Sequence, residues 1–187
     1  YVSKNSIFAN SDKTLSHVIS LSVYSDSDFV IIDDSSRRNL ELTSNLRDGT
    51  IHYSLLETVE HTKTAMGKRM LCSFFMSPLK NLEQIKNREQ HTALFFENTN
   101  MLESIRIELG KILDVERLAS RIAMGRAHAK DIQALRISLE RWLVMRAIIS
   151  DYTGEFGNAF YAGETDTAKE ICTYIASSIL DDPSTSL

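Results

Sequence analysis

Glycine and proline are both scarce in this sequence, with seven and two residues among 187. These residue types build most tight turns, and a sheet of many strands needs a turn after each strand. A composition so poor in turn residues disfavours an all-β or many-stranded fold. It favours long helices, and we predict a mainly α fold built as a helical bundle.

Cysteine is also rare, and its two residues, Cys72 and Cys172, lie a hundred positions apart. Neither belongs to a Cys-x-x-Cys pair, so the spacing of a zinc site or of a disulfide framework is missing. We interpret both as small hydrophobic side chains of the core. This usage is typical of a reducing compartment, and we expect an intracellular, cytoplasmic protein.

Positive charge and long apolar runs are lacking as well. The formal net charge is -4 and the sequence pI is about 5.7, whereas dedicated nucleic-acid-binding domains are usually basic. The longest apolar runs are as short as residues 29–32, and a membrane-spanning helix needs about 20 apolar residues. We therefore expect no membrane association, and the composition by itself does not indicate a DNA-binding surface.

Motifs that would indicate catalysis or cofactor binding are missing too. A phosphate-binding loop reads Gly-x-x-x-x-Gly-Lys-Ser/Thr, and both Gly67-Lys68-Arg69 and Gly110-Lys111-Ile112 lack the final hydroxyl residue. No His-Glu-x-x-His or Gly-x-Ser-x-Gly sequence occurs, and Glu57 with His61 forms a single i,i+4 pair of possible ligands. We predict no catalytic, cofactor-binding or metal-binding residue, and hence no enzyme activity in this segment.

A strand pattern is present near the start of the chain. Residues 19–24 alternate between apolar and polar side chains, which is the period of a half-buried strand. The polar run 25–28 resembles a turn, and the apolar run 29–32 resembles a partner strand. These segments predict a small N-terminal β-hairpin.

Helical signals dominate the rest of the chain. Asp, Ser, Thr and Asn residues that can cap a helix precede apolar residues at helical spacing. We also expect Gly125 to end one helix as its C′ residue, and Thr167 with Glu170 to open the last helix as a capping box. The helices predicted from these signals cover about residues 33–43, 54–60, 62–76, 81–98, 101–109, 114–124, 132–149 and 168–179.

The most regular apolar spacing lies in the predicted helix 132–149. Its apolar residues follow one another at intervals of three and four, with Arg146 at the remaining position of the series. Such a stripe predicts a long helix that packs along another helix as in a coiled coil. The stripe consists of Ile132, Leu135, Leu139, Trp142 and Ile149.

A set of short segments, met in a fixed order, resembles one known family. The segments are residues 33–42 (DDSSRRNLEL), 54–59 (SLLETV), 64–71 (TAMGKRML), 78–79 (PL), 114–118 (DVERL) and 120–126 (SRIAMGR). Together they resemble the helical core, or lever, domain of MutS-type DNA mismatch repair proteins over about residues 17–150. An ordered set of this kind is more specific than any single motif.

The resemblance implies a layout and a function. Residues 1–16 would be the end of a connector domain, and residues 17–187 the first part of the core (lever) domain, truncated before the clamp. The start at Tyr1 and the stop after Pro183 agree with a segment of a longer protein. The parent is expected to be a DNA-dependent ATPase that uses ATP and Mg, binds mismatched double-stranded DNA, forms a homodimer and works with a MutL-type partner. This segment would couple its ATPase domain to its DNA clamp.

Six residues at matching positions are expected to be structural or interface residues that fix helix orientation: Arg37, Arg38, Gly67, Arg69, Glu116 and Arg117. Gly67 stands inside a predicted helix, where glycine costs about 1 kcal/mol relative to alanine, so we expect close packing against another backbone. One departure is His128-Ala129, where many family members have Ser/Thr-Pro. Histidine is a weaker cap, so we expect a shifted or frayed start of the following helix.

Two other hypotheses stay open at the level of the sequence. The chain could come from a MutS-family paralogue that acts in recombination, which a mismatch-reading sequence upstream of Tyr1 would exclude. It could also be a free-standing helical adaptor, which a Walker motif downstream of Leu187 would exclude.

Overall fold

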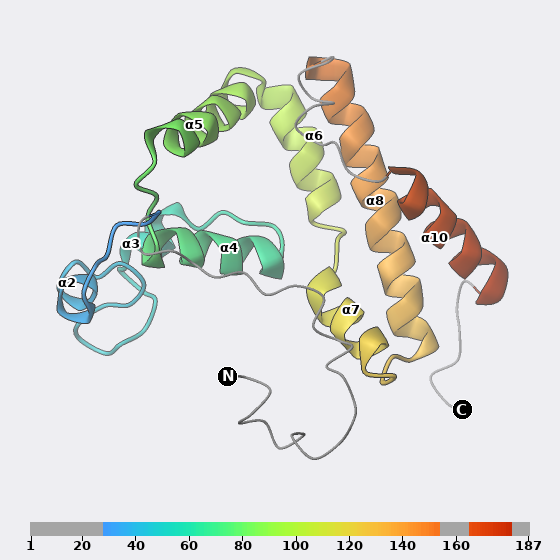
Figure 1. The fold of residues 1–187 in the computed structure, drawn as a ribbon, viewed down its shortest axis with the longest axis horizontal. Helices are drawn as coiled ribbons and strands as arrows, with labels where there is room; N and C mark the ends of the chain where they lie inside the picture. Colours follow the sequence, from blue (N-terminus) through green and yellow to red (C-terminus); the bar gives the residue numbers. More distant parts are fainter. Residues whose placement is uncertain (1–27, 154–164, 181–187) are drawn as a thin grey trace.

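The structure, a computed structural model, describes residues 28–153 and 165–180, and these residues are mainly helical (Figure 1). They form eight α-helices and no β-strand. The mainly α fold is therefore confirmed for the described residues. The helices are α2 (Asp34–Asn39), α3 (Leu55–Val59), α4 (Ala65–Met76), α5 (Leu82–Glu97), α6 (Thr99–Leu109), α7 (Val115–Ala123), α8 (Ala129–Thr153) and α10 (Thr165–Ser178).

Side-chain caps fix the starts of five of these helices. In each, an oxygen of the cap side chain accepts a backbone N–H of the first turn, which has no partner inside the helix. The predicted starts of α2, α3, α5 and α7 are confirmed, and α4 is capped by Thr64, one of the two threonines, Thr62 and Thr64, that could open it. The caps are Asp33 for α2, Ser54 for α3, Thr64 for α4, Asn81 for α5 and Asp114 for α7.

The structure does not support the predicted β-hairpin. Its first strand and its turn, residues 19–27, lie outside the described residues. Its second strand is wrong, because Phe29 makes an isolated antiparallel bridge with Leu79 and residues 30–32 belong to no strand. The N–H of Val30 donates to the carbonyl of Pro78 at 2.8 Å. The backbone at this point therefore pairs with the loop between α4 and α5.

Helix α2 is shorter than predicted, because the chain turns at Glu41 and not after Thr43. Glu41 has a φ of 48°, in the left-handed region that stops a helix. The N–H of Glu41 donates to the carbonyl of Arg38, and the N–H of Leu42 donates to the carbonyl of Arg37. This is a Schellman closure without glycine, so the usual sequence signal for the end of a helix is missing.

Helix α7 ends in the same closure at the predicted glycine. Gly125 has a φ of 65°, and its N–H donates to the carbonyl of Ile122 at 2.9 Å. The N–H of Arg126 donates to the carbonyl of Arg121, also at 2.9 Å. The prediction that Gly125 is the C′ residue is confirmed, and the reversal lets α8 run back along α7.

Helix α8 is the centre of the fold, and α6, α7 and α10 pack against it. A core of four buried apolar side chains joins α6 to α8: Met101, Ile105, Met145 and Ile149. Helices α6, α7, α8 and α10 together are called the body. Helices α2, α3 and α4, with the loops between them (residues 34–76), are called the arm, and α5 connects the arm to α6 (Figure 1).

The apolar stripe of α8 is confirmed only in part. Ile149 is buried, but Leu139 and Trp142 are half-buried, whereas Met145 and Ser138, which lie outside the stripe, are buried. A two-helix coiled coil would bury a single seam. Helix α8 has neighbours on several faces, so its buried residues are spread around the helix.

The last helix differs from its prediction at its start and in its buried face. Helix α10 includes Thr165, so Thr167 lies inside the helix and the predicted capping box is wrong. Cys172 is buried, as predicted, whereas Ile171 is 39% exposed. In the parts of the chain that the structure describes, no helix has the length and apolar character needed to cross a membrane.

Candidate functional site

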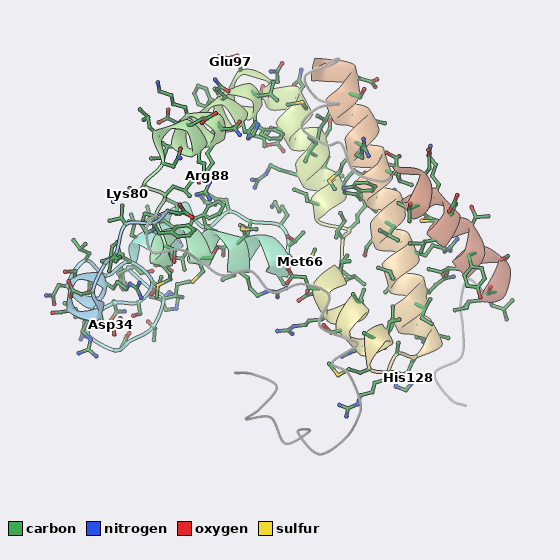
Figure 2. The ribbon with its side chains drawn as sticks, viewed as in Figure 1. Asp34, Met66, Lys80, Arg88, Glu97 and His128 are labelled. Atoms are coloured by element: carbon green, nitrogen blue, oxygen red, sulfur yellow. The ribbon has the colours of Figure 1, made fainter. Side chains whose placement is uncertain are left out.

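Arg69 of the arm pairs with carboxylates of the body. The guanidinium of Arg69 in α4 donates to both carboxylate oxygens of Asp114, with each N–O distance 2.8 Å, and also to the carboxylate of Glu116. Figure 2 shows Met66, one turn before Arg69, at the end of α4 that lies nearest α7. This bidentate geometry fixes orientation as well as distance.

Asp114 serves two helices at once. It is the N-cap of α7, where its carboxylate accepts the N–H of Arg117 at 3.4 Å, and the Arg117 side chain lies 3.3 Å from the same carboxylate. The pKa of Asp114 is lowered from 3.8 to about 2, chiefly by the hydrogen bonds from Arg69 and also by the amide of Arg117, against the opposing effect of desolvation. The same carboxylate contacts raise the pKa of Arg69, so this pair is ionised at neutral pH.

Three of the six predicted structural residues therefore meet at one place: Arg69, Glu116 and Arg117. Glu116 and Arg117 form the exposed rim of the cluster, while the side chain of Asp114 is mostly covered. The sequence indicated Asp114 only as a helix cap. No local signal linked it to Arg69, because the two residues are 45 positions apart.

The predicted residues of α2 have different surroundings. Arg37 donates to the carbonyl of Met76 at 3.0 Å, and it lies 3.6 Å from Asp34. A cation at a helix C-terminus neutralises carbonyls that lack intrahelical partners, so Arg37 fastens α2 to the end of α4. Its Nε is buried and has no hydrogen-bond partner in the described structure. Arg38 is exposed on α2 and is not part of the Arg69 cluster.

Gly67 is tightly enclosed, but not by another backbone as predicted. A Cβ at this position would lie 3.0 Å from Oγ1 of Thr64 and 3.6 Å from Cβ of Thr62. Oγ1 of Thr64 is the cap oxygen of α4, and it accepts the N–H of Gly67 at 3.0 Å. Glycine therefore leaves room for the helix cap, two residues before Arg69.

A second carboxylate links α7 to α8. Asp131 accepts the N–H of His128 at 3.1 Å, and Arg121 of α7 donates to it at 2.8 Å. The pKa of Asp131 is lowered, chiefly by the His128 amide. Helix α8 begins at Ala129, directly after His128, so the predicted shift of its start is wrong. The carboxylate of Asp131 makes the reciprocal half of a capping box, because it accepts the N–H of the residue before the helix.

The loop before α7 is fastened to α8 by a buried hydroxyl. The N–H of Leu113 donates to Oγ of Ser138 at 3.1 Å, and this hydroxyl donates to the carbonyl of Ala134 at 2.8 Å. Ser138 is only 1% exposed. The buried hydroxyl therefore has both a donor and an acceptor as partners.

An apolar cavity of about 460 Å³ lies beside this junction, between the start of α4 and the body. It is lined by residues of α4, α8 and α10 and by the segment 109–115, and none of its lining side chains titrates. The lining residues are Thr64, Met66, Leu109, Ile112, Val115, Ser138, Leu139, Trp142, Met145, Thr167, Ala168 and Ile171. Such a lining has no titratable side chain that could act as an acid or a base towards its Ser and Thr hydroxyls.

Candidate metal ligands do not converge in the described structure. Among residues 28–153 and 165–180, no group of three His, Cys, Asp or Glu side chains could hold a metal ion. Glu57 does not pair with His61 as predicted, because its carboxylate lies 2.8 Å from Nδ1 of His52 and accepts the N–H of Tyr53. This contact closes a turn and is structural.

Similarity to known proteins supplies the family. The family described as MutS domain III matches residues 35–187. A protein named DNA mismatch repair protein MutS, from Treponema denticola, is 43% identical over 141 residues, which are 75% of this chain and 16% of that protein. Proteins of the same name are 36% identical over 168 residues in Treponema pallidum and 33% identical over 183 residues in Clostridium novyi.

These alignments cover 90% and 98% of this chain but only 19% and 20% of the two proteins. The chain thus spans about a fifth of the length of its relatives. The order of its motifs, its helical fold and the match over residues 35–187 agree with one another. The chain belongs to the MutS domain III family.

Proposed function

We propose that this chain is the lever segment of a MutS-type DNA mismatch repair protein and couples an ATPase domain to a DNA clamp. The observation that carries the proposal is the match to MutS domain III over residues 35–187. The relatives are named for DNA mismatch repair, which favours this function over a recombination paralogue. Because the chain matches one domain of much longer proteins, the family match also favours it over a free-standing adaptor.

The described helices support a mechanical role. Helix α8 has 25 residues, and at 1.5 Å per residue it is a rod of about 37 Å. Packing against α6, α7 and α10 holds it along its length. A rigid helix of this kind passes a displacement at one end to the other end, and packed helices shift as bodies. Arg37, Arg69, Glu116 and Arg117 then set the angles between helices and take no part in chemistry.

The parent protein is expected to supply the remaining parts. It would bind and hydrolyse ATP with Mg, bind mismatched double-stranded DNA, form a homodimer, work with a MutL-type partner and act in the cytoplasm. Residues 1–16 would end its connector, and residues 17–187 would begin its core domain before the clamp. The sequence has no Gly-x-x-x-x-Gly-Lys-Ser/Thr run, so the proposal places the nucleotide site of the parent outside this segment.

The proposal is tested with the purified chain and with its complete open reading frame. We expect the chain to show no ATP turnover and no preference for mismatched over matched duplex in a binding titration. Measurable ATP turnover by the chain would contradict a purely mechanical role. A Walker motif downstream in the reading frame is expected, and a complete frame without one would exclude a MutS-type parent.

A further inference from the structure

At each end of α7 a carboxylate contacts both an arginine side chain and a backbone N–H at the start of a helix. Asp114 caps α7 and receives two hydrogen bonds of 2.8 Å from Arg69 in the arm. Asp131 accepts the N–H of His128 before α8, at 3.1 Å, and receives a hydrogen bond of 2.8 Å from Arg121 of α7. Each carboxylate thus joins the N-terminus of one helix to an arginine of an earlier helix.

We propose that α7 is a coupling helix, which passes a displacement of the arm at Arg69 to the first turn of α8 through Asp114, Arg121 and Asp131. The inference rests on the proposed lever function and names the route by which the arm acts on the lever. The route is a chain of paired groups, in which each helix is held at its start by the helix before it.

The coupling helix has the properties that such a role needs. It has nine residues, about 13 Å at 1.5 Å per residue, so it is too short to bend appreciably. Leu118 is buried, and α7 packs on α8. Asp114 caps its start, and the Schellman closure at Gly125 fixes its end. The bidentate contact of Arg69 with Asp114 keeps direction as well as distance, and a single charged hydrogen bond joins Arg121 to Asp131.

Direct apolar contact between the arm and α8 is a weaker route. The cavity of about 460 Å³ lies between Met66 of α4 and Leu139 and Trp142 of α8. Close-packed side chains transmit displacement, whereas a cavity of this size absorbs it. The Arg69 cluster crosses the same interval with short, oriented contacts.

A fixed point next to Asp114 makes the coupling directional. The N–H of Leu113 donates to the buried hydroxyl of Ser138 in α8. A pull by Arg69 on Asp114 therefore turns α7 about its neighbour Leu113. Such a rotation moves the far end of α7, where Arg121 holds Asp131.

Amide hydrogen exchange of the whole chain tests this route. The variant Arg69→Met removes the guanidinium and keeps an unbranched side chain. We expect exchange of the amides of Asp131 and Ile132, in the first turn of α8, to rise by about threefold or more in this variant. The matched control is Arg117→Met, because Arg117 also pairs with Asp114 but belongs to α7. We expect the control to leave the α8 amides unchanged.

An increase confined to the first turn of α7 in Arg69→Met would overturn the proposal. If exchange rises throughout the chain, a double-mutant cycle of thermal midpoints with Arg121→Met decides the outcome. Arg69 and Arg121 share no hydrogen-bond partner among the described residues, and independent sites give additive shifts. A non-additive shift supports the coupling helix, and an additive shift overturns it.

The test of the coupling helix and the test of the proposed lever function can fail independently of each other. If the exchange result holds but the parent protein shows no link between nucleotide and DNA binding, the lever function fails and the coupling helix remains. If the parent shows that link while α8 does not respond to Arg69→Met, the lever function remains and the coupling helix fails.

Discussion

The guanidinium of Arg69 holds both carboxylate oxygens of Asp114 at 2.8 Å across 45 positions of sequence. The arginine belongs to the arm, and the aspartate caps the first turn of α7 in the body. The orientation of the arm is thereby tied to the start of a body helix.

Loss of the bidentate contact between Arg69 and Asp114 is expected to lower the thermal stability in steps. Lysine keeps the charge of Arg69 but cannot contact both oxygens, and methionine loses both charge and hydrogen bonds. We therefore expect the Tm, followed by circular dichroism, to fall in the order wild type, Arg69→Lys, Arg69→Met. Arg38→Met is the control, because Arg38 is exposed and outside the cluster. Equal Tm values for wild type and Arg69→Met would show that the contact does not stabilise the fold.

The contribution of Asp114 is expected to depend on pH in a defined window. Its folded pKa of about 2 lies below the ordinary value of 3.8, so the ionised carboxylate stabilises the fold fully above about pH 4. This contribution decreases as the pH falls towards 2. Asp114→Asn keeps a good helix cap and removes the charge. We predict that the difference in urea unfolding free energy between wild type and Asp114→Asn narrows from pH 5 to pH 2.

A difference that stays constant over this range would contradict the role of the Asp114 charge. The comparison isolates Asp114 because the other carboxylates with lowered pKa values, such as Asp131 and Glu108, are present in both proteins. Their contribution to acid unfolding cancels in the difference.

Two glycines give a matched test of the Thr64 cap. A Cβ on Gly110 would meet carbonyl oxygens of Arg106 and Ile107 at an ordinary 3.6 Å, so Gly110→Ala should stabilise by about 0.5 kcal/mol through the unfolded chain. A Cβ on Gly67 would lie 3.0 Å from the cap oxygen of Thr64. Disturbing a cap costs about 1 kcal/mol, which offsets the gain in helix propensity. We expect no stabilisation by Gly67→Ala in urea unfolding, and a gain equal to that of Gly110→Ala would refute this.

Removal of the Ser138 hydroxyl is expected to lower the free energy of unfolding. Ser138→Ala removes a hydroxyl that is only 1% exposed, together with the hydrogen bond that it accepts from the N–H of Leu113, and the loss of one such hydrogen bond costs about 0.5–1.5 kcal/mol. Ser73→Ala is the control, because Ser73 is exposed and its hydroxyl also donates to a helix carbonyl. We expect this control to change the unfolding free energy by about 0.5 kcal/mol or less. Similar values for the two variants would mean that the Leu113 contact is not stabilising.

The sequence was sufficient to predict features that depend on a few neighbouring residues. The starts of α2, α3, α4, α5 and α7 follow from cap residues, and a cap contacts amides only two or three positions away. The end of α7 followed from Gly125. The end of α2 did not, because Glu41 takes a left-handed conformation that glycine would have signalled.

Features that depend on distant segments were missed. The spacing in α8 indicated which residues are apolar, but not that α6, α7 and α10 would cover several faces of the helix. The strand predicted at residues 29–32 pairs only through Phe29 with Leu79, which lies beyond α4. Family resemblance pointed to Arg69 and Glu116, but the bidentate contact of Arg69 with Asp114 depends on α4 lying beside α7, 45 positions further along the chain.

The central claim is that α8 acts as a rigid lever in the parent protein, and one measurement tests it most directly. Val144 and Ala147 lie on the exposed side of α8, where two glycines soften a helix by about 1 kcal/mol each. In the full-length protein, the ATP-induced change in affinity for a mismatched duplex is compared between Val144→Gly/Ala147→Gly and the control Val144→Ala/Ala147→Ser.

Hydrogen exchange in α8 verifies the softening. We predict that the glycine variant keeps its ATP turnover within about twofold of the control but loses most of the ATP-induced change in affinity. An unchanged ATP response, together with faster exchange in α8, would contradict the lever account.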